Sequence, residues 1–468
     1  MTAHRHGFAA AAAAAPAQQP TAALWAAFAA YTAVSYAVLQ QVNGEVESPY
    51  MDEIFHIPQA QQYCQGYFAD WDPKLTTPPG LYLVSTAMHS ALTVFQKLWG
   101  IDSPCTVAFL RTTNWLASLC VFWLAADIRR HVTNRQPTVG EILGLALYPV
   151  AFFFHHMYYT DTLSLALVLA CYAMRLRGRP WMAAACGFAA LWLRQTNVIW
   201  VAFVGLTALL HDANAEDSLA ALFRWVFGRS SGQGGLRATL QIALPYALVG
   251  FAFIVFVLHN GGIVLGDKAN HAAVLHFPQA LYFLGFTAAI SLPTFLWHAA
   301  PHCLWRTAVQ RHGIPRTLLC LSLTAALMCI AVHRYTIEHA FLLSDNRHYA
   351  FYVWKDVFRR HWAARYVAVV GYVWAAWAAT GVVRQGWVWQ AGLLGCLAAV
   401  LVPSPLLEFR YFTVGWFFVR MHARRVPNAV QWAEVAWMAA INAMTVWVFL
   451  RRPFLWPSEP GVAQRFMW

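Results

Sequence analysis

Long apolar runs separated by short arginine-rich segments are the feature that most constrains the fold of this chain. They recur from residue 22 to residue 450 of the 468-residue sequence. An apolar run of about 20 residues is long enough to cross a bilayer as a helix. The composition agrees, because 59% of residues are hydrophobic and 11% are charged, whereas soluble domains carry about 25% charged residues. The pattern predicts an all-α polytopic membrane protein.

The arginine clusters between the apolar runs favour a membrane protein over a nucleic-acid binder. The net charge of +12 would suit either class. Positive charge confined to short loops, however, follows the positive-inside rule and does not form a surface that tracks phosphates. We therefore expect no nucleic-acid partner and place segments 128–138 and 209–237 in the cytosol. The clusters lie at 129–135, 175–179, 306–316 and 420–425.

The apolar runs predict about 12–14 membrane-spanning helices. The run 81–98 is interpreted as an amphipathic helix along the membrane surface, because counting it as a span would reverse the side of the following arginine cluster. Segment 181–208 is expected to form two short helices, because the polar stretch "RQTN" at 194–197 interrupts it and a charge at the bilayer centre is costly. The candidate spans are 22–42, 107–127, 139–157, 161–177, 181–208, 238–258, 278–298, 317–333, 366–384, 386–405, 409–422 and 430–450.

The domain organisation is predicted to be simple. The alanine-rich start, residues 1–20, is expected to be disordered, and residues 21–468 are expected to form one membrane domain. Within it, 43–106 forms a long first loop on the non-cytosolic side, and 209–237 is a connector with a Gly/Ser-rich end. Cys64 and Cys105 share the first loop and can pair if it faces an oxidising compartment.

Polar residues gather in the segments assigned to the non-cytosolic face. The stretch "SPYMDEIFH" places two carboxylates and a histidine directly after the first predicted span. A carboxylate there can act as a general base toward an acceptor hydroxyl, while cationic side chains bind the phosphate of a lipid-linked donor and stabilise its departure. We expect neither a metal nor a cofactor. The candidate site residues are Asp52, Glu53, His56, Lys74, Arg194, Lys268, His271, Arg347, His348 and Arg410.

Each of these residues also has a structural interpretation. Asp52 and Glu53 can be solvated loop charges, and His56 can be a structural hydrogen-bonding group. Asp161 heads a predicted span and is expected to cap that helix. The functional interpretation depends on the joint placement of acids and bases on one face beside a membrane.

Several motifs in order resemble one known family, the dolichyl-phosphate-glucose-dependent alpha-1,2-glucosyltransferases of the endoplasmic reticulum. The resemblance runs from residue 50 to the end of the sequence. It implies a GT-C membrane glycosyltransferase fold in the endoplasmic reticulum membrane, with a luminal active site and no metal. The donor would be dolichyl-phosphate glucose, and the acceptor a dolichol-linked oligosaccharide that receives its third and last glucose for protein N-glycosylation. The motifs are "MDEIFHIPQAQQYC", "WDPKLTTPPGLYLVS", "YYTD", "RQTNVIW", "GDKANHAAVLHFPQ", "SDNRHYAFYVWK" and "QRFMW".

The resemblance also implies residue roles. Related GT-C enzymes carry their catalytic carboxylate in the first luminal loop, which corresponds to Asp52 and Glu53 here, and we favour Asp52. They invert the anomeric centre of the donor sugar. Near residue 410 the sequence departs from the family pattern, because Phe409 and Gly415 stand where prolines are usual.

Three other functions remain open at this point. The first is transfer of a different sugar by another dolichyl-phosphate-sugar-dependent GT-C enzyme. The second is a transporter, which predicts ionisable residues deep within spans and paired repeats. The third is a non-enzymatic regulator of a membrane channel. The sequence shows no internal repeat, and its charges lie in loops and at predicted helix ends.

Overall fold

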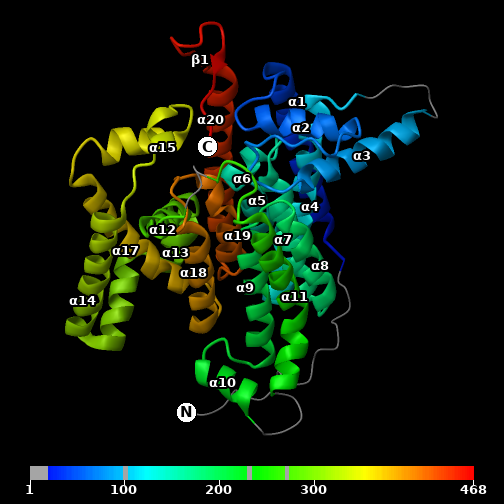
Figure 1. Cartoon of the computed structure of the whole chain (residues 1–468). Helices are drawn as coiled ribbons and strands as arrows, with labels where there is room; N and C mark the ends of the chain where they lie inside the picture. Colours follow the sequence, from blue (N-terminus) through cyan, green and yellow to red (C-terminus); the bar gives the residue numbers. More distant parts are fainter. Residues whose placement is uncertain (1–18, 98–103, 229–234, 269–272) are drawn as a thin grey trace.

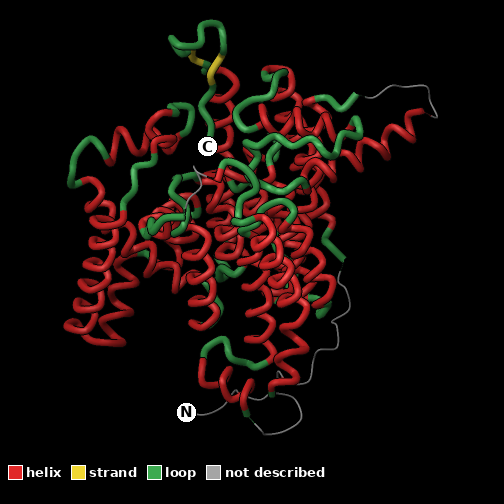
Figure 2. The backbone as a smooth tube through the Cα atoms, in the orientation of Figure 1, coloured by secondary structure: helices red, strands yellow, loops and turns green. Residues whose placement is uncertain are grey.

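The computed structural model describes residues 19–97, 104–228, 235–268 and 273–468. Residues 1–18 of the segment 1–20 predicted to be disordered lie outside the described residues, as does the candidate site residue His271. Helices dominate the described chain, and its only paired strands are β1 (Phe454–Leu455) and β2 (Ala463–Gln464), which are antiparallel (Figure 1). Figure 2 shows that most of the longer loops lie in the upper half of the view, around the C-terminus.

The helices follow one another with few long connections. The first half of the chain contains α1 (Ala22–Glu45), α2 (Glu53–Cys64), α3 (Gly80–Lys97), α4 (Val107–Thr133), α5 (Val139–Ala146), α6 (Pro149–Phe154), α7 (Thr160–Leu176), α8 (Pro180–Leu191), α9 (Asn197–Asp212) and α10 (Leu219–Phe227). The second half contains α11 (Leu236–Asn260), α12 (Pro278–Ile290), α13 (Leu292–Ala299), α14 (Pro301–Tyr335), α15 (Ala340–Ser344), α16 (Tyr349–Tyr352), a π-helical turn (Val353–Phe358), α17 (Ala364–Val382), α18 (Trp387–Leu401), a 3-10 turn (Phe409–Phe412), α19 (Thr413–Met421) and α20 (Asn428–Arg451).

Five helical segments in the described part of the chain are long and apolar enough to cross a membrane. Four shorter apolar helices accompany them: α8, α9, α12 and α18. The all-α polytopic membrane architecture is therefore confirmed, while the count of about 12–14 spans and the GT-C fold stay predictions. The five segments are α1, α4, α11, the stretch Leu292–Tyr335 that contains α13 and α14, and α20.

The predicted break in segment 181–208 agrees with the structure, whereas the membrane-surface position of segment 81–98 stays a prediction. Segment 181–208 forms α8 and α9, with "RQTN" at the turn between them. Segment 81–98 corresponds to α3, which runs at a steep angle to α9 and α11 (Figure 1). The break in the first case separates two short apolar helices so that Arg194 lies at a helix end.

Three predicted spans differ from the structure. Segment 139–157 is two helices, because Pro149 begins a new helix after α5 ends. Segment 278–298 divides at Ser291, which ends α12 and directly precedes Leu292, the first residue of α13. Segment 409–422 is a 3-10 turn followed by α19 of nine residues, and nine residues extend only about 14 Å as a helix, which is too short to span a bilayer.

Local sequence explains where several helices begin. Thr21 caps α1, because its side chain accepts a hydrogen bond from the Leu24 amide. Thr138 and Glu141 form a capping box at the start of α5, in which each side chain satisfies a free backbone amide. Within α14, Gly313 adopts a φ of 76° and divides the helix into two parts, a conformation that glycine adopts without a steric penalty.

The core that supports the site is a bundle with aromatic layers. Helix α7 packs against α4 and α8, and α20 packs against α5, α6 and α13. The rings of Tyr148 and Trp416 are stacked at 4.1 Å between centroids, and those of Trp200 and Phe418 at 5.5 Å. These contacts hold α19, which directly follows the 3-10 turn that carries Arg410, against the start of α6 and against α9.

The first loop is anchored to the bundle. Helices α2 and α3 pack against each other and against α4. Cys64, at the end of α2, forms a disulfide with Cys105, which lies just before α4. The conditional pairing of these two cysteines is therefore present, and it ties the end of α2, the helix that carries Glu53 and His56, to the start of α4.

Candidate active site

A tight turn before α2 separates the side chains of Asp52 and Glu53. Met51 adopts a φ of 54°, which is uncommon for a residue other than glycine. The Asp52 amide donates a hydrogen bond to the Tyr159 hydroxyl at 3.1 Å. Helix α2 then begins at Glu53. The two neighbouring carboxylates consequently enter different surroundings.

Glu53 is buried in a closed cluster, which we define as Glu53 and Arg111. Its side chain has no exposed surface. Arg111 from α4 binds it through two nitrogens, with Nε to Oε1 at 2.9 Å and Nη2 to Oε2 at 2.6 Å. The amides of Tyr158 and Tyr50 donate to the same carboxylate at 2.6 and 3.1 Å. Every oxygen of Glu53 therefore has two donors, and this satisfied pair joins the first loop to α4.

Asp52 lies in an open cluster, which we define as Asp52, Asp161, Arg194, Glu408 and Arg410. Its side chain keeps 38% of its surface exposed, and Arg410 Nη1 lies 2.9 Å from its Oδ2. Burial alone would raise the pKa of Asp52, but Arg410, His56 and His348 outweigh that effect and the pKa lies below the usual value of 3.8. Asp52 is therefore ionised at neutral pH and accessible to solvent.

Arg410 connects three carboxylates. Its Nε contacts Glu408, its Nη1 donates to Asp52, and the same Nη1 lies 3.9 Å from Asp161 Oδ2. Its guanidinium also lies over the Tyr159 ring, 5.5 Å from the centroid. A planar guanidinium with several donors suits this arrangement, and a lysine ammonium would not reproduce it.

Arg194 completes the open cluster from the turn between α8 and α9. Its Nη2 donates to Asp161 at 3.2 Å, and its Nε donates to the Thr160 hydroxyl at 3.2 Å. The capping role expected for Asp161 is wrong, because α7 begins at Thr160 with no side-chain cap. The Asp161 carboxylate instead lies between two arginines.

His56 lies one turn along α2 from Asp52. Its Nδ1 is 2.6 Å from the hydroxyl of Tyr82, which belongs to α3. Burial is the main cause that lowers the pKa of His56 to about 4, with Arg410 and Arg194 adding to it and Asp52 opposing it. His56 is therefore neutral at physiological pH and ties α2 to α3.

A second polar group surrounds Arg347. The guanidinium binds Asp345 through Nε to Oδ1 at 2.8 Å and Nη2 to Oδ2 at 2.7 Å. It also donates to Gln464 Oε1 at 3.1 Å and lies 4.6 Å from the Trp456 ring centroid. His348 Nδ1 lies 2.9 Å from the main-chain oxygen of Trp468. The local pair between Asp345 and Arg347 is thus present, and it belongs to a larger group.

The segment 465–468 connects the two polar regions. The Arg465 amide donates to the Tyr50 hydroxyl at 2.7 Å, and this hydroxyl lies 2.7 Å from the Arg465 oxygen. The Met467 amide donates to the Arg347 oxygen at 2.8 Å. The Trp468 ring packs edge-on against Phe409, the neighbour of Arg410. This segment therefore holds the Asp52 turn, the Arg347 group and the Arg410 turn together.

Two predicted cations are engaged elsewhere. Lys74 lies over the Phe55 ring at 5.2 Å from its centroid. Lys268 Nζ donates to the Asn260 oxygen at 2.7 Å. Neither contacts the open cluster.

The open cluster also contains two residues that are not among the candidate site residues predicted from the sequence. These are Asp161 and Glu408, which lie in the motifs "YYTD" and "EFRYF".

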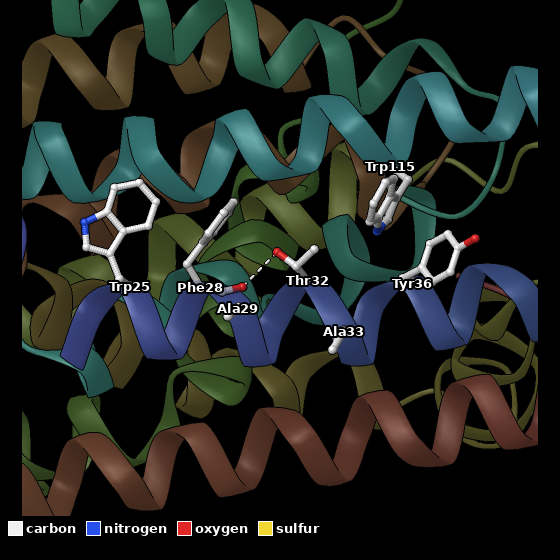
Figure 3. Close-up of a pocket in the computed structure, with 7 residues that line it drawn as sticks. All are labelled: Trp25, Phe28, Ala29, Thr32, Ala33, Tyr36 and Trp115. Atoms are coloured by element: carbon white, nitrogen blue, oxygen red, sulfur yellow. Dashed lines mark hydrogen bonds between the residues drawn. The ribbon is translucent and has the colours of Figure 1, made fainter. Parts of the chain in front are cut away.

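An apolar groove runs between α1 and α4 (Figure 3). It has a volume of about 500 Å³. Trp25, Phe28 and Tyr36 line it from α1, and Trp115 lines it from α4. Trp115 lies one helical turn from Arg111, so one end of the groove is near the closed cluster. Among the described residues, no group of three or more His, Cys, Asp or Glu side chains could hold a metal ion.

Comparisons with known proteins give a consistent result. The model of the DIE2/ALG10 family matches residues 46–421. Two human proteins, each named Dol-P-Glc:Glc(2)Man(9)GlcNAc(2)-PP-Dol alpha-1,2-glucosyltransferase, are 35% identical over 93% of this chain and 96% of their own length. An Arabidopsis thaliana protein of the same name is 33% identical over 91% of this chain and 96% of its length. No solved structure matches the chain.

Proposed function

The chain belongs to the DIE2/ALG10 family, and from this premise we propose that it transfers glucose with Asp52 as the general base. It is a dolichyl-phosphate-glucose-dependent alpha-1,2-glucosyltransferase. The acceptor is Glc(2)Man(9)GlcNAc(2) linked through diphosphate to dolichol, as the names of the relatives state. The family expected from the sequence motifs is therefore confirmed.

One observation carries the assignment of the base. Of the two adjacent carboxylates, only Asp52 is both ionised and accessible, with 38% of its side chain exposed. Glu53 has no exposed surface and is bound by Arg111 and two backbone amides. A general base must come within hydrogen-bond reach of the hydroxyl that it deprotonates. We therefore assign the base to Asp52 and a structural role to Glu53.

The transfer proceeds by one displacement at the anomeric carbon. The acceptor hydroxyl oxygen forms the new bond to this carbon while Asp52 takes the hydroxyl proton. The bond from the anomeric carbon to the phosphate oxygen breaks, and dolichyl phosphate leaves with the electron pair. The configuration inverts, so that a beta-linked donor yields an alpha linkage.

Arg410 fixes the position of the base. It donates to Asp52 while Glu408 and Asp161 compensate the rest of its charge. The contact keeps Asp52 ionised and oriented, although a carboxylate with a lowered pKa is a weaker base. Accurate placement of the reacting groups accounts for a large part of enzymatic rate enhancement. Arg194 supports this arrangement through Asp161.

The donor phosphate is assigned to cations at the same end of the molecule. Residues 465–468 connect the segment that carries Arg347 and His348 to the Asp52 turn. The charge of His348 also contributes to the lowered pKa of Asp52. Arg410 is a further candidate, whereas Lys74 and Lys268 are less suited because their contacts are elsewhere. The apolar groove between α1 and α4 offers a surface for a prenyl chain (Figure 3).

The donor-phosphate assignment is tested with Arg347→Lys and Arg347→Ala. Loss of one charge-assisted contact costs about 1.5–3 kcal/mol, so we expect roughly a 10- to 150-fold loss of transfer. Glucose transfer is measured against donor concentration at saturating acceptor. An unchanged donor dependence and turnover in both variants would remove Arg347 from the donor site.

We place the site in the lumen of the endoplasmic reticulum, with segment 128–138 in the cytosol. The arginine clusters support this orientation under the positive-inside rule. The sequence contains no Asn-x-Ser/Thr sequon, so inserted sequons report cleanly. A sequon inserted near residue 46 should be glycosylated and one near residue 133 should not. The opposite pattern would reverse the orientation.

The function itself is tested with the purified full-length protein in lipid. The protein is given dolichyl-phosphate glucose and the twice-glucosylated dolichol-linked acceptor, and the product is resolved by mass. We expect one added glucose with an alpha-1,2 linkage. The once-glucosylated acceptor and dolichyl-phosphate mannose serve as controls. Transfer to the wrong acceptor or from mannose would indicate another enzyme of the same superfamily, and no transfer would favour a non-enzymatic membrane role.

A further inference from the structure

An arginine-lined pocket lies at the far end of α4 from the Asp52 site. Near the start of α4, Arg111 holds Glu53, while Thr133 at its end lines this pocket. Helix α4 is a candidate membrane span of 27 residues. A helix of that length extends about 40 Å, more than the roughly 30 Å of hydrocarbon in a bilayer. The pocket therefore lies on the opposite membrane face from Asp52.

The pocket has a volume of about 400 Å³ and a basic lining. Its lining residues in the described part of the chain include no carboxylate. It is large enough for a phosphate group with part of the molecule that carries it. The lining residues are Thr133, Arg135, Arg384, Ala423, Arg424 and Arg425.

Backbone pairing holds two of these arginines in place. The Arg384 amide donates to the His422 oxygen at 3.0 Å, and the Arg424 amide donates to the Val382 oxygen at 2.8 Å. Val383 and Ala423 form an antiparallel bridge between the same two loops. The loops after α17 and α19 are therefore joined, so Arg384 and Arg424 are presented by a fixed backbone.

The arginines of the pocket differ in what their side chains already bind. Arg135 is paired with Glu141, and Arg384 donates to the Val132 oxygen at 2.7 Å. Arg424 and Arg425 are exposed. Within the described residues, neither of these two side chains makes a hydrogen bond or an ion pair. Two guanidinium groups therefore remain available for a ligand.

The side chains behind the pocket do not neutralise the charges of Arg424 and Arg425. The adjoining internal cavity is lined by Arg129 and Arg420 together with Glu141 and Glu434. Arg129 is paired with Glu141, and Arg420 with Glu434. Across both cavities six arginines face two glutamates, so the positive charge is concentrated at the open pocket.

We propose that this pocket binds a phosphate-bearing anion on the membrane face opposite the active site. Guanidinium groups bind phosphate oxygens through paired hydrogen bonds, and Arg424 and Arg425 have free donors. The pocket lies at the end of a membrane span, where lipid headgroups are within reach. The phosphate can thus belong to an anionic lipid or to a soluble molecule.

The experiment measures thermal unfolding of the full-length protein in nanodiscs. One arm adds phosphatidic acid to phosphatidylcholine discs. A second arm keeps phosphatidylcholine alone and adds inorganic phosphate, with sodium chloride matched for ionic strength. We expect the melting temperature to rise in at least one arm. A rise with phosphatidic acid alone identifies a lipid headgroup, and a rise with inorganic phosphate indicates that the phosphate group is sufficient.

The variants are Arg425→Gln and the double variant Arg424→Gln with Arg425→Gln. Each lost arginine should weaken binding by about 10-fold or more. The matched control is Arg306→Gln with Arg311→Gln, which removes the same charge from exposed positions in α14. The proposal is overturned if no probe moves the melting temperature, or if both double variants lose the response equally. Arg425→Gln removes a side chain without a partner among the described residues, so it tests the pocket even if the double variant misfolds.

Discussion

The adjacent residues Asp52 and Glu53 belong to two different arginine–carboxylate clusters, the open cluster and the closed cluster. The two clusters differ in their access to water. In the closed cluster, Glu53 and Arg111 have no exposed side-chain surface and four donors satisfy one carboxylate. In the open cluster, three carboxylates share two arginines and Asp52 keeps 38% of its side chain exposed.

The difference shows how one short motif serves two purposes. A buried ion pair contributes little net stability but costs about 3–5 kcal/mol when one partner is removed. The closed cluster therefore makes the position of the loop depend on Glu53. The open cluster leaves Asp52, its most exposed carboxylate, accessible to solvent, and the fixed loop determines where that carboxylate lies.

The largest expected effect is on catalysis at the open cluster. Asp52→Asn keeps the shape of the side chain but cannot take a proton, so we expect transfer to fall by about 10²–10⁴-fold. Stability should change little, because Arg410 retains Glu408 and Asp161. Transfer is measured at matched protein level, with the exposed loop residue in Asp70→Asn as control. An active Asp52→Asn enzyme would remove Asp52 from the mechanism.

The next effect concerns stability at the closed cluster. Glu53→Gln leaves the buried Arg111 without a charged partner, and we expect a loss of about 3–5 kcal/mol. Unfolding of the purified protein measures it, and turnover per folded molecule should be much less affected than in Asp52→Asn. The double variant Glu53→Gln with Arg111→Gln should lose less than the sum of the single variants, because the two charges interact.

If instead folded Glu53→Gln protein is inactive while Asp52→Asn protein is active, the roles of the two carboxylates are exchanged. Additive losses in the double variant would contradict the coupling between Glu53 and Arg111.

Arg410→Lys tests whether the open cluster needs a guanidinium. One ammonium cannot contact Glu408, Asp52 and Asp161 in the same geometry, so we expect roughly a 10- to 150-fold loss of transfer. In the neutral variant Arg410→Gln the acid limb of the rate profile should also move to higher pH, because the charge of Arg410 is the largest of the effects that lower the pKa of Asp52. A loss of rate with an unmoved pH profile would indicate a purely structural role.

The smallest effect is a pH dependence of stability from His56. Its pKa falls from 6.5 in the unfolded chain to about 4 in the folded protein. The unfolded state therefore takes up a proton first as the pH falls, and the contribution to stability is present above 6.5 and is lost toward 4. Between pH 6.5 and pH 5 the loss is about 1.6 kcal/mol.

His56→Gln should remove this contribution to the loss of stability at low pH. Substitution of the exposed His211 by Gln serves as the control and should leave that loss unchanged. Unfolding at the two pH values is the measurement. Equal acid sensitivity in wild type and His56→Gln would mean that His56 is not held neutral in the folded protein.

The sequence by itself determined the membrane architecture and the family. Apolar length requires helices in lipid because backbone groups there must pair internally, and this holds regardless of how helices pack. The polar interruption at 194–197 was sufficient to divide α8 from α9. Short helices were harder to predict, because apolar residues continue on both sides of the breaks at Pro149 and Ser291.

Only the tertiary structure decided which of the candidate site residues lie together. Asp52 and Arg410 are 358 positions apart, and Glu53 meets Arg111 from another helix. Adjacent carboxylates look equivalent in a sequence, because burial and partners arise from segments distant along the chain. For the same reason the sequence did not show that Asp161 pairs with Arg194, or that Lys74 and Lys268 make their contacts away from the open cluster. Residue types and helices follow from local chemistry, whereas the ionisation and accessibility of each side chain depend on its neighbours in space.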